Sequence, residues 1–221
     1  MCIVVESQIE YYERESRTFN PIQHVARRLQ DMESKSDYGA MVASKWKEIV
    51  NQTLQNEVYP VVHPIGQETF SLYAEFPTGV FEYALDIDGA TSLIKEESRK
   101  PKCFMPTEII SSVEEGNINK DVRTIKTNHK NPIMVLQSLY ITGGQPYCIN
   151  GNHRIFEAHR HNERQVEVYV FNELEFIPFF YDMWSKAIYF LEMDYYHVMH
   201  NETNVLHDEY TAYAYKFTSQ L

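Results

Sequence analysis

The sequence predicts an α+β protein: a core of a small mixed sheet with helices, preceded by N-terminal helices and followed by a long C-terminal helix. Between Cys103 and Phe171 the hydrophobic pattern runs in the order strand, helix, strand, strand, helix, strand. Before residue 57 and after residue 171, apolar residues recur at helical spacing. We divide the chain into a helical segment (1–56), a β-rich segment packed on the core (57–102), the core (103–171) and an aromatic helical extension (172–221).

Helices are expected throughout the first segment. Between Ser7 and Glu33 the apolar residues recur at helical spacing, with an interruption near Asn20 and Pro21. Because proline is favoured in the first turn of a helix, this interruption predicts two short helices. A further helix is predicted from Tyr38 to Asn56, with an apolar face made of Val42, Trp46, Ile49, Val50 and Leu54.

The segment 57–102 is rich in β-branched and aromatic residues, and prolines and glycines divide it. This pattern predicts three short strands, with turns near Pro64–Gly66 and Pro77–Gly79, and with Asp88-Gly89 closing the last strand. A short polar helix and a solvated charged loop are expected over residues 91–102.

The extension after Asn172 carries many aromatic residues. The run from Ile177 to His200 predicts one long helix, whereas residues 205–217 fit a helix or a strand equally well. Aromatic side chains at such spacing are expected in a core or an interface rather than around a cofactor. Residues 173–221 also hold eight acidic and two basic residues, which suits a protein partner with a basic surface, or a homo-oligomer.

The composition narrows the function classes. The 221 residues carry a formal net charge of -11, which argues against a protein that mainly grips the DNA backbone, because that task needs a basic face. The three cysteines show no paired spacing, so neither a disulfide framework nor a zinc ribbon is predicted. The sequence also lacks a signal peptide pattern and any apolar run long enough for a membrane helix. We therefore expect a cytoplasmic protein with no membrane segment.

A glycine turn is the strongest functional feature of the sequence. A predicted strand ends at Asn150, Gly151 supplies a tight turn, and a helix begins at Asn152 or His153 and runs to about residue 162. Unpaired N–H groups and the macrodipole make such a helix start an anion site, where His153 and Arg154 add side-chain donors. Alternatively, Asn152 only caps the helix and the two basic side chains are solvated. Cations are unfavourable at the positive end of a helix, and a bound anion would remove that conflict.

The string from Ile149 to Arg154, followed by the strand from Val166 to Phe171, resembles the ParB/sulfiredoxin superfamily. In that superfamily a strand leads into a Gly-x-His-Arg type turn that holds nucleotide phosphates at a helix start. Upstream, Pro132–Val135 resembles the family's proline-led strand and Asn119–Thr127 its preceding helix. The resemblance covers about residues 103–171, less than a third of the chain, and implies a nucleotide-binding fold in which Gly151, Asn152, His153 and Arg154 hold phosphate.

The branches of this superfamily differ in what they imply. Sulfiredoxins carry their catalytic cysteine where this chain has Asn152, so sulfinic acid repair is excluded. ParB proteins bind CTP and add a helix-turn-helix domain, which is not evident here. The free serine kinases use a glutamate base within a segment that Pro106, Glu108, Glu114 and Glu115 resemble. This likeness makes Glu114 the candidate catalytic base, although the same residues also fit an ordinary acidic turn.

The resemblance further implies that polar residues of the preceding helix touch the nucleotide. Lys120 and Thr124 are the candidates, against the alternative of a solvated surface stripe. Residues 107–171 contain seven basic and seven acidic residues, so the core is neutral within an acidic molecule. Histidine pairs at 159 and 161 and at 197 and 200 lack further ligands, so no metal site made of protein side chains is predicted.

The leading hypothesis is a nucleotide-binding protein that performs phosphoryl transfer, like a small-molecule kinase, or nucleotide hydrolysis. Its expected cofactor is ATP, ADP or CTP, with Mg2+ carried by the nucleotide. The main alternative is a non-catalytic regulatory or protein-interaction module that keeps the fold and uses the aromatic C-terminal region. DNA binding or nuclease activity is disfavoured by the charge balance.

Overall fold

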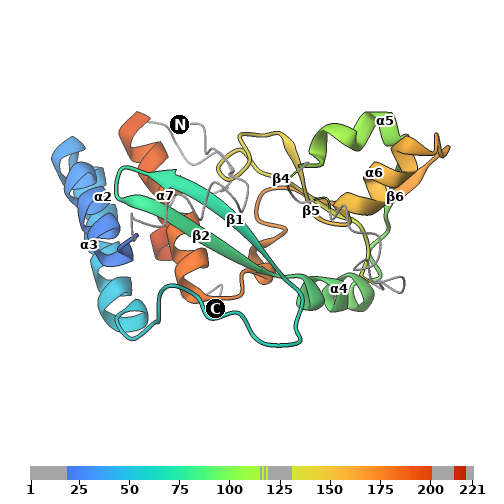
Figure 1. The fold of residues 1–221 in the computed structure, drawn as a ribbon. Helices are drawn as coiled ribbons and strands as arrows, with labels where there is room; N and C mark the ends of the chain where they lie inside the picture. Colours follow the sequence, from blue (N-terminus) through green and yellow to red (C-terminus); the bar gives the residue numbers. More distant parts are fainter. Residues whose placement is uncertain (1–18, 115, 117, 119–130, 201–211, 218–221) are drawn as a thin grey trace. The chain divides into compact units, whose positions relative to one another are not determined.

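The computed structural model describes residues 19–114, 116, 118, 131–200 and 212–217 (Figure 1). The chain forms two compact units. The sheet unit contains His63–Glu75 and Phe81–Tyr181, and the helical unit contains residues 19–62, 76–80 and those that follow Tyr181. Helices and strands are both well represented, which confirms the α+β class.

Three helices of the helical unit pack against one another: α2 (Pro21–Lys35), α3 (Asp37–Ile49) and α7 (Met183–His200). The predicted start at Asn20 and Pro21 is confirmed, because the Asn20 side chain accepts a hydrogen bond from the Gln23 amide at 2.9 Å. The helix predicted from Tyr38 is also confirmed, and it continues as a π-helical turn, Val50–Leu54. The helix predicted before Asn20 lies outside the described residues.

A buried carboxylate ties the end of the described chain to α7. Asp194 accepts hydrogen bonds from the indole N–H of Trp46 at 2.9 Å and from the amides of Tyr213 and Ala214 at 2.7 and 2.9 Å. Burial raises the pKa of this carboxyl to about 7, although its three hydrogen bonds act in the opposite direction. The two amides belong to the start of a short 3-10 turn, Tyr213–Tyr215, within the segment whose structure the sequence left open.

Two strands, β1 (Thr69–Phe76) and β2 (Gly79–Asp86), form a hairpin. The turn predicted at Pro77–Gly79 is confirmed, but residues 57–63 form no strand, and two prolines in this neighbourhood remove amide donors from it. The prediction that Asp88-Gly89 closes the last strand is wrong. The helix α4 (Ile87–Glu96) begins there instead, because the Asp86 carboxylate accepts from the Gly89 amide at 2.8 Å and caps it.

Among the described residues, four strands form the second sheet in the order β3-β6-β4-β5. The strands β3 (Lys102–Phe104) and β6 (Val166–Phe171) are antiparallel, β6 and β4 (Met134–Gln137) are parallel, and β4 and β5 (Pro146–Asn150) are antiparallel. The helices α5 (Pro106–Ile109) and α6 (Asn152–Arg160) contact each other, and a 3-10 turn, Ile110–Ser112, follows α5. An apolar cluster forms the core between these helices and the sheet: Ile109, Ile133, Val135, Cys148, Ile155, Ala158, Val166 and Val168.

Of the elements predicted from Cys103 to Phe171, the four strands and the helix that follows Gly151 are confirmed, whereas the helix predicted at Asn119–Thr127 lies outside the described residues. A 3-10 turn, Ile177–Phe179, follows β6, and the Tyr181 amide then donates to the Ala84 carbonyl of β2 at 2.9 Å.

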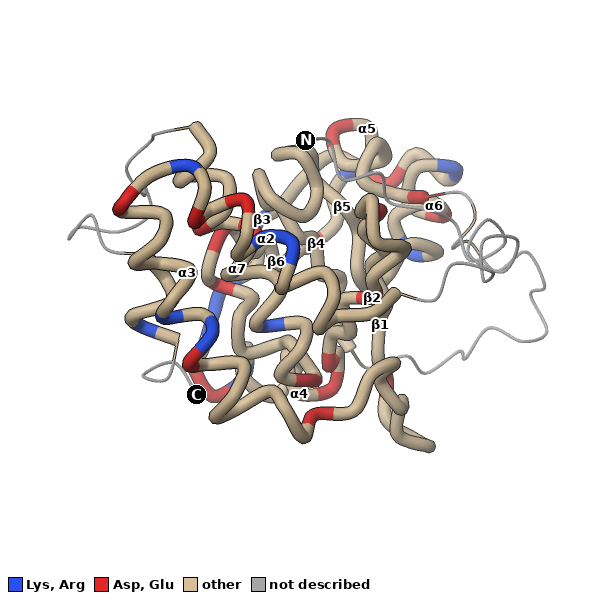
Figure 2. Tube along the Cα trace, turned by 90° about the vertical axis from the view of Figure 1, so that its left-hand side faces the viewer, with Lys and Arg blue, Asp and Glu red and all other residues tan. Residues whose placement is uncertain are grey.

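Acidic residues flank the start of α4, within the sheet unit (Figure 2). None of the described helices is long and apolar enough to cross a membrane.

Candidate functional site

The predicted strand, glycine turn and helix are all present at Gly151. Strand β5 ends at Asn150, Gly151 has φ +96°, and α6 begins at Asn152. A side chain is excluded here on two grounds: the backbone is left-handed, and a Cβ would lie 2.8 Å from Cγ1 and 3.2 Å from Cα of Ile133. The backbone conformation and the close approach of Ile133 therefore both require glycine at this position.

The start of α6 offers unpaired backbone donors. The amides of Arg154 and Ile155 donate to the Gly151 carbonyl at 2.9 and 3.1 Å. The amides of Asn152 and His153 precede them in the first turn, where no intrahelical acceptor exists. Together with the helix dipole, these N–H groups favour an anion at the turn.

The guanidinium of Arg154 is the most informative group at the turn. Its Nη2 is buried and has no hydrogen-bond partner among the described residues, and it would lie 3.0 Å from a Cβ at Gly151. Burial lowers the pKa of Arg154, while electrostatic interactions with Cys148 and Glu68 act against that shift. A guanidinium nevertheless keeps its charge in a protein, so the buried Nη2 of this cation is a donor that a bound anion could satisfy.

The two residues between Gly151 and Arg154 have different surroundings. Asn152 is the first residue of the helix and not its cap, since Gly151 occupies the N-cap position. Its Nδ2 donates to the Cys148 carbonyl at 3.1 Å, while its Oδ1 is buried without a partner among the described residues. His153 is half-buried, with Nε2 3.9 Å from a carboxylate oxygen of Glu157, and so remains accessible to a ligand.

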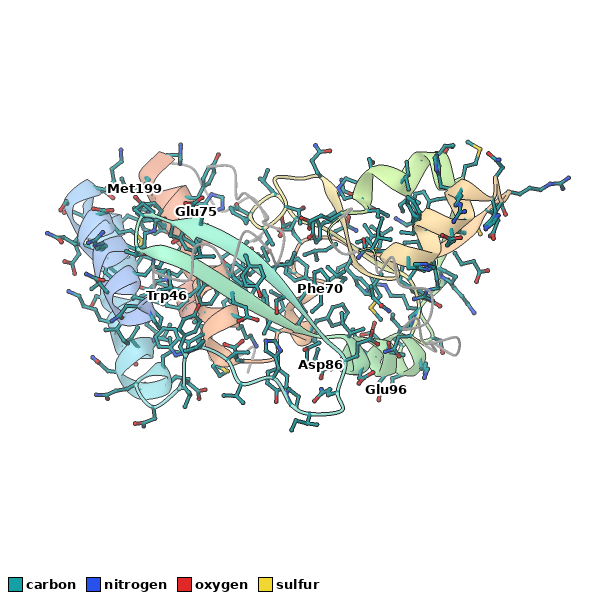
Figure 3. The ribbon with its side chains drawn as sticks, viewed as in Figure 1. Trp46, Phe70, Glu75, Asp86, Glu96 and Met199 are labelled. Carbon is teal, nitrogen blue, oxygen red and sulfur yellow. The ribbon has the colours of Figure 1, made fainter. Side chains whose placement is uncertain are left out.

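An open cleft of about 350 Å3 lies at this turn, within the sheet unit. One side is the end of β5 and the start of α6, and another is the start of β1, where the aromatic ring of Phe70 contributes (Figure 3). The lining residues are Glu68, Thr69, Phe70, Ile87, Gly116, Ile118, Ile149, Asn150, Gly151 and Asn152.

The sequence analysis missed two carboxylates here: Glu68 lines the cleft, and Asp88 is bonded to the Glu68 amide. The Nδ2 of Asn131 donates to Glu68 and, at 2.9 Å, to Asp88, while the Glu68 amide donates to Asp88 at 2.7 Å. The sequence contained a signal for the position of Glu68, because a turn at Pro77 and Thr78 places Glu68 opposite the end of β2. The Ile87 amide accordingly donates to the Glu68 carbonyl at 3.0 Å.

These carboxylates suit a cation that a nucleotide brings with it. Among the described residues, no three His, Cys, Asp or Glu side chains come together in a way that could hold a metal ion by themselves. Mg2+ is commonly bound by one or two carboxylates, with water and phosphate oxygens completing the shell. Glu68 and Asp88 would supply the protein oxygens of such a shell.

The predicted base, Glu114, lies beside β5 rather than in the wall of the cleft. It accepts a hydrogen bond from the Tyr147 hydroxyl, and the Tyr147 ring contacts Phe70, with the two ring centroids 6.1 Å apart. Glu108 of the same segment caps α5, since it accepts from the Met105 amide at 2.8 Å. Glu115, Lys120 and Thr124 lie outside the described residues.

Thiol chemistry has no support at this site. Burial raises the pKa of Cys148 to about 12, so that at neutral pH it is a buried, protonated thiol. Asn152 stands at the position where the sulfiredoxin branch carries its cysteine. The cleft therefore offers anion donors, carboxylates and hydroxyls rather than a reactive sulfur.

Comparisons of the chain with protein-family models, with curated proteins and with solved structures each found no match. The likeness to the ParB/sulfiredoxin superfamily thus depends on the residues of the turn and on the order of the strands around it. What the site is able to bind follows from its own contacts, chiefly those of Arg154, Glu68 and the start of α6.

Proposed function

We propose that the sheet unit is a nucleotide-binding module of the ParB/sulfiredoxin-like type, which uses the nucleotide for phosphoryl transfer or hydrolysis. One observation carries this proposal: Nη2 of Arg154, buried and without a hydrogen-bond partner among the described residues, lies close to Gly151, the residue that precedes the first turn of α6. A phosphate at Gly151 would satisfy the guanidinium and both amides at once.

The rest of the cleft supplies groups for the other parts of a nucleotide. The ring of Phe70 offers a surface on which a base can stack. Glu68 and Asp88 would hold Mg2+, which offsets the charge of the phosphates and so permits attack on the terminal phosphorus. The resemblance assigns the role of base to Glu114, and its hydrogen bond from Tyr147 would fix the orientation of that carboxylate.

The sheet topology supports the same family assignment. The superfamily resemblance requires a strand that leads directly into the phosphate turn and a later strand that follows the helix. The strands β5 and β6 stand in those positions, with β4 between them in the sheet. Lys120 and Thr124 remain proposed nucleotide contacts.

Thermal unfolding with ATP, ADP, CTP or GTP plus Mg2+ tests the proposal. A nucleotide present at a hundred times its Kd should stabilise the protein by about 2.7 kcal/mol. Arg154→Ala should abolish this stabilisation. Arg160→Ala is the matched control, because Arg160 lies on the same helix with an exposed side chain. If no nucleotide raises the Tm of the wild-type protein, the proposed function is wrong.

The alternative of an interaction module through the aromatic extension gains no specific support. Along α7 the large rings of Trp184, Tyr189 and Phe190 are buried inside the helical unit, where they build its core. The Trp184 indole also donates to the Glu57 carbonyl at 3.2 Å. These rings stabilise the fold and present little surface to a partner.

A further inference from the structure

A chain of three polar side chains in the sheet unit ends at the cleft. Nδ1 of His63 lies 2.8 Å from the hydroxyl of Thr69, and Nε2 of the same ring lies 2.7 Å from a carboxylate oxygen of Glu82. Thr69 is the first residue of β1 and lines the same cleft as Gly151. The order hydroxyl, imidazole, carboxylate therefore leads from the cleft into the protein.

The contacts of this chain define where the protons lie when the imidazole is neutral. The carboxylate of Glu82 is buried and, when ionised, can only accept; it also receives the hydroxyl of Ser71. In the neutral imidazole, Nε2 then carries the proton that faces Glu82, and Nδ1 is an acceptor. In that tautomer the Thr69 hydroxyl donates to Nδ1.

This arrangement is that of an activated nucleophile: a hydroxyl bound to a general base, with the base oriented by a carboxylate. Structural networks of this kind also occur without chemistry. What distinguishes this one is that its hydroxyl end lines the same cleft as Gly151, Asn152 and Glu68. A nucleophile there would share the cleft with the bound phosphates.

We propose that Thr69 is a covalent phosphoryl acceptor, with His63 as its general base and Glu82 as the residue that positions the imidazole. The proposal rests on the function proposed above. The Thr69 oxygen attacks the terminal phosphorus of a nucleoside triphosphate, and the bond from that phosphorus to the bridging oxygen breaks. Nucleoside diphosphate leaves, and the hydroxyl proton passes to His63 Nδ1, where Glu82 stabilises the imidazolium. The product is phosphothreonine at position 69.

The test is to incubate the full chain with Mg2+ and ATP, CTP or GTP labelled at the terminal phosphate, to quench samples in acid over time, and to map the labelled peptide. We expect label on Thr69 in the wild-type protein and in Thr69→Ser, which keeps the hydroxyl. Thr69→Val should lose the label entirely. Thr107→Val, an exposed threonine on α5, is the matched control and should be labelled like the wild type.

The base and its positioning residue have separate readouts. His63→Gln should slow labelling by a factor on the order of 100 to 10,000, because proton removal is lost. Glu82→Gln should slow it less and shift its pH profile, since the imidazole then loses its orienting charge. A purely structural network would change the Tm of these variants without changing the pH profile of labelling.

The outcomes separate the two proposals. If nucleotide raises the Tm of the wild type and of Thr69→Val, but no label reaches Thr69, then the covalent role is overturned and nucleotide binding stands. Label on another residue overturns it equally. If no nucleotide raises the Tm and no label appears, both proposals fail together.

Discussion

Two arginines, the buried Arg28 of the helical unit and the half-buried Arg154 of the sheet unit, have opposite surroundings. In the helical unit, Arg28 donates to both carboxylate oxygens of Glu192, at 2.7 and 2.8 Å, and stacks 4.0 Å from the centroid of the Tyr195 ring. In the sheet unit, Arg154 forms no ion pair with any described residue. Burial by itself acts to lower the pKa of both guanidinium groups. At Arg28 the charge and hydrogen bonds of Glu192 outweigh burial, so the pKa is raised, whereas the pKa of Arg154 is lowered.

The difference indicates what each arginine does. Arg28 belongs to a closed network: His24 also reaches Glu192, with Nε2 at 2.9 Å, and contacts the Thr78 hydroxyl at 2.8 Å through Nδ1. All of these groups lie in the helical unit and satisfy one another, which is typical of a structural role. At Arg154, no hydrogen bond from a described residue to Nη2 offsets the cost of partly burying the guanidinium, which is typical of a group that binds a ligand.

The largest expected effect follows from removing the Glu192 carboxylate from the network around Arg28. Glu192→Ala would leave Arg28 buried without its counter-ion, so we expect a loss of roughly 3 to 5 kcal/mol in the free energy of unfolding. Urea denaturation followed by circular dichroism measures it. Lys47→Ala is a suitable control, because its ion pair with Glu33 is exposed and should contribute about 1 kcal/mol or less. A loss below about 1 kcal/mol for Glu192→Ala would contradict the structural role of the Arg28 network.

The second prediction concerns the charge of Arg154 in the sheet unit. Arg154→Met keeps the length and the apolar contacts of the side chain but removes its charge. We expect the unfolding free energy without ligand to stay within about 1 kcal/mol of the wild type or to rise, because an uncompensated buried charge is removed. The stabilisation by nucleotide, about 2.7 kcal/mol at a hundred times the Kd, should be lost. A large loss of stability without ligand would instead give Arg154 a structural role.

A third prediction sharpens the description of the helical unit, where Asp194 is a buried carboxyl without a basic partner in its three hydrogen bonds. Its folded pKa of about 7 lies above its ordinary value of 3.8. The neutral form therefore contributes stability that is fully present below about pH 4 and is lost as the pH rises through 7. Between pH 5 and pH 8 we expect a fall of about 2 to 3 kcal/mol.

Thermal or urea unfolding across this pH range measures the change, and Asp194→Asn serves as its reference. The asparagine variant is destabilised overall, because its amide group cannot accept all three hydrogen bonds, but its stability should depend less on pH. An equal pH dependence in both proteins would show that other groups cause the change.

The smallest effect is expected at the turn itself. Gly151→Ala places a Cβ against Ile133 in a left-handed conformation, so we expect a loss of about 1 to 3 kcal/mol in the unfolding free energy. Nucleotide binding should weaken as well, because the added Cβ would lie only 3.0 Å from Nη2 of Arg154 and would displace the guanidinium. Gly66→Ala is the matched control: Gly66 also has a positive φ, but a Cβ added there would meet no atom within 4 Å. Equal binding by both variants would move the phosphate site away from Gly151.

The sequence predicted features that short-range patterns determine. Asn20 with Pro21 marked a helix start, and the strand, glycine and helix around Gly151 were located to within a residue at the turn. Contacts between distant residues were not predictable in this way. Glu192 meets Arg28 across 164 positions, and neither side chain stands in a motif. Glu68 was missed because Asp88 was taken as part of a closing turn, whereas it lies in the first turn of α4 and accepts from the Glu68 amide.

The contact between Gly151 and Ile133 also predicts how relatives of this protein should vary. Position 151 is limited to glycine by its backbone and by the space that Ile133 leaves, so these two positions form a coupled pair. Across diverged sequences we expect glycine to be invariant at 151, while the residue at 133 changes only among side chains of similar shape. A distant homologue is therefore best recognised by this pair, one strand apart, even where the flanking helices have lost all sequence similarity.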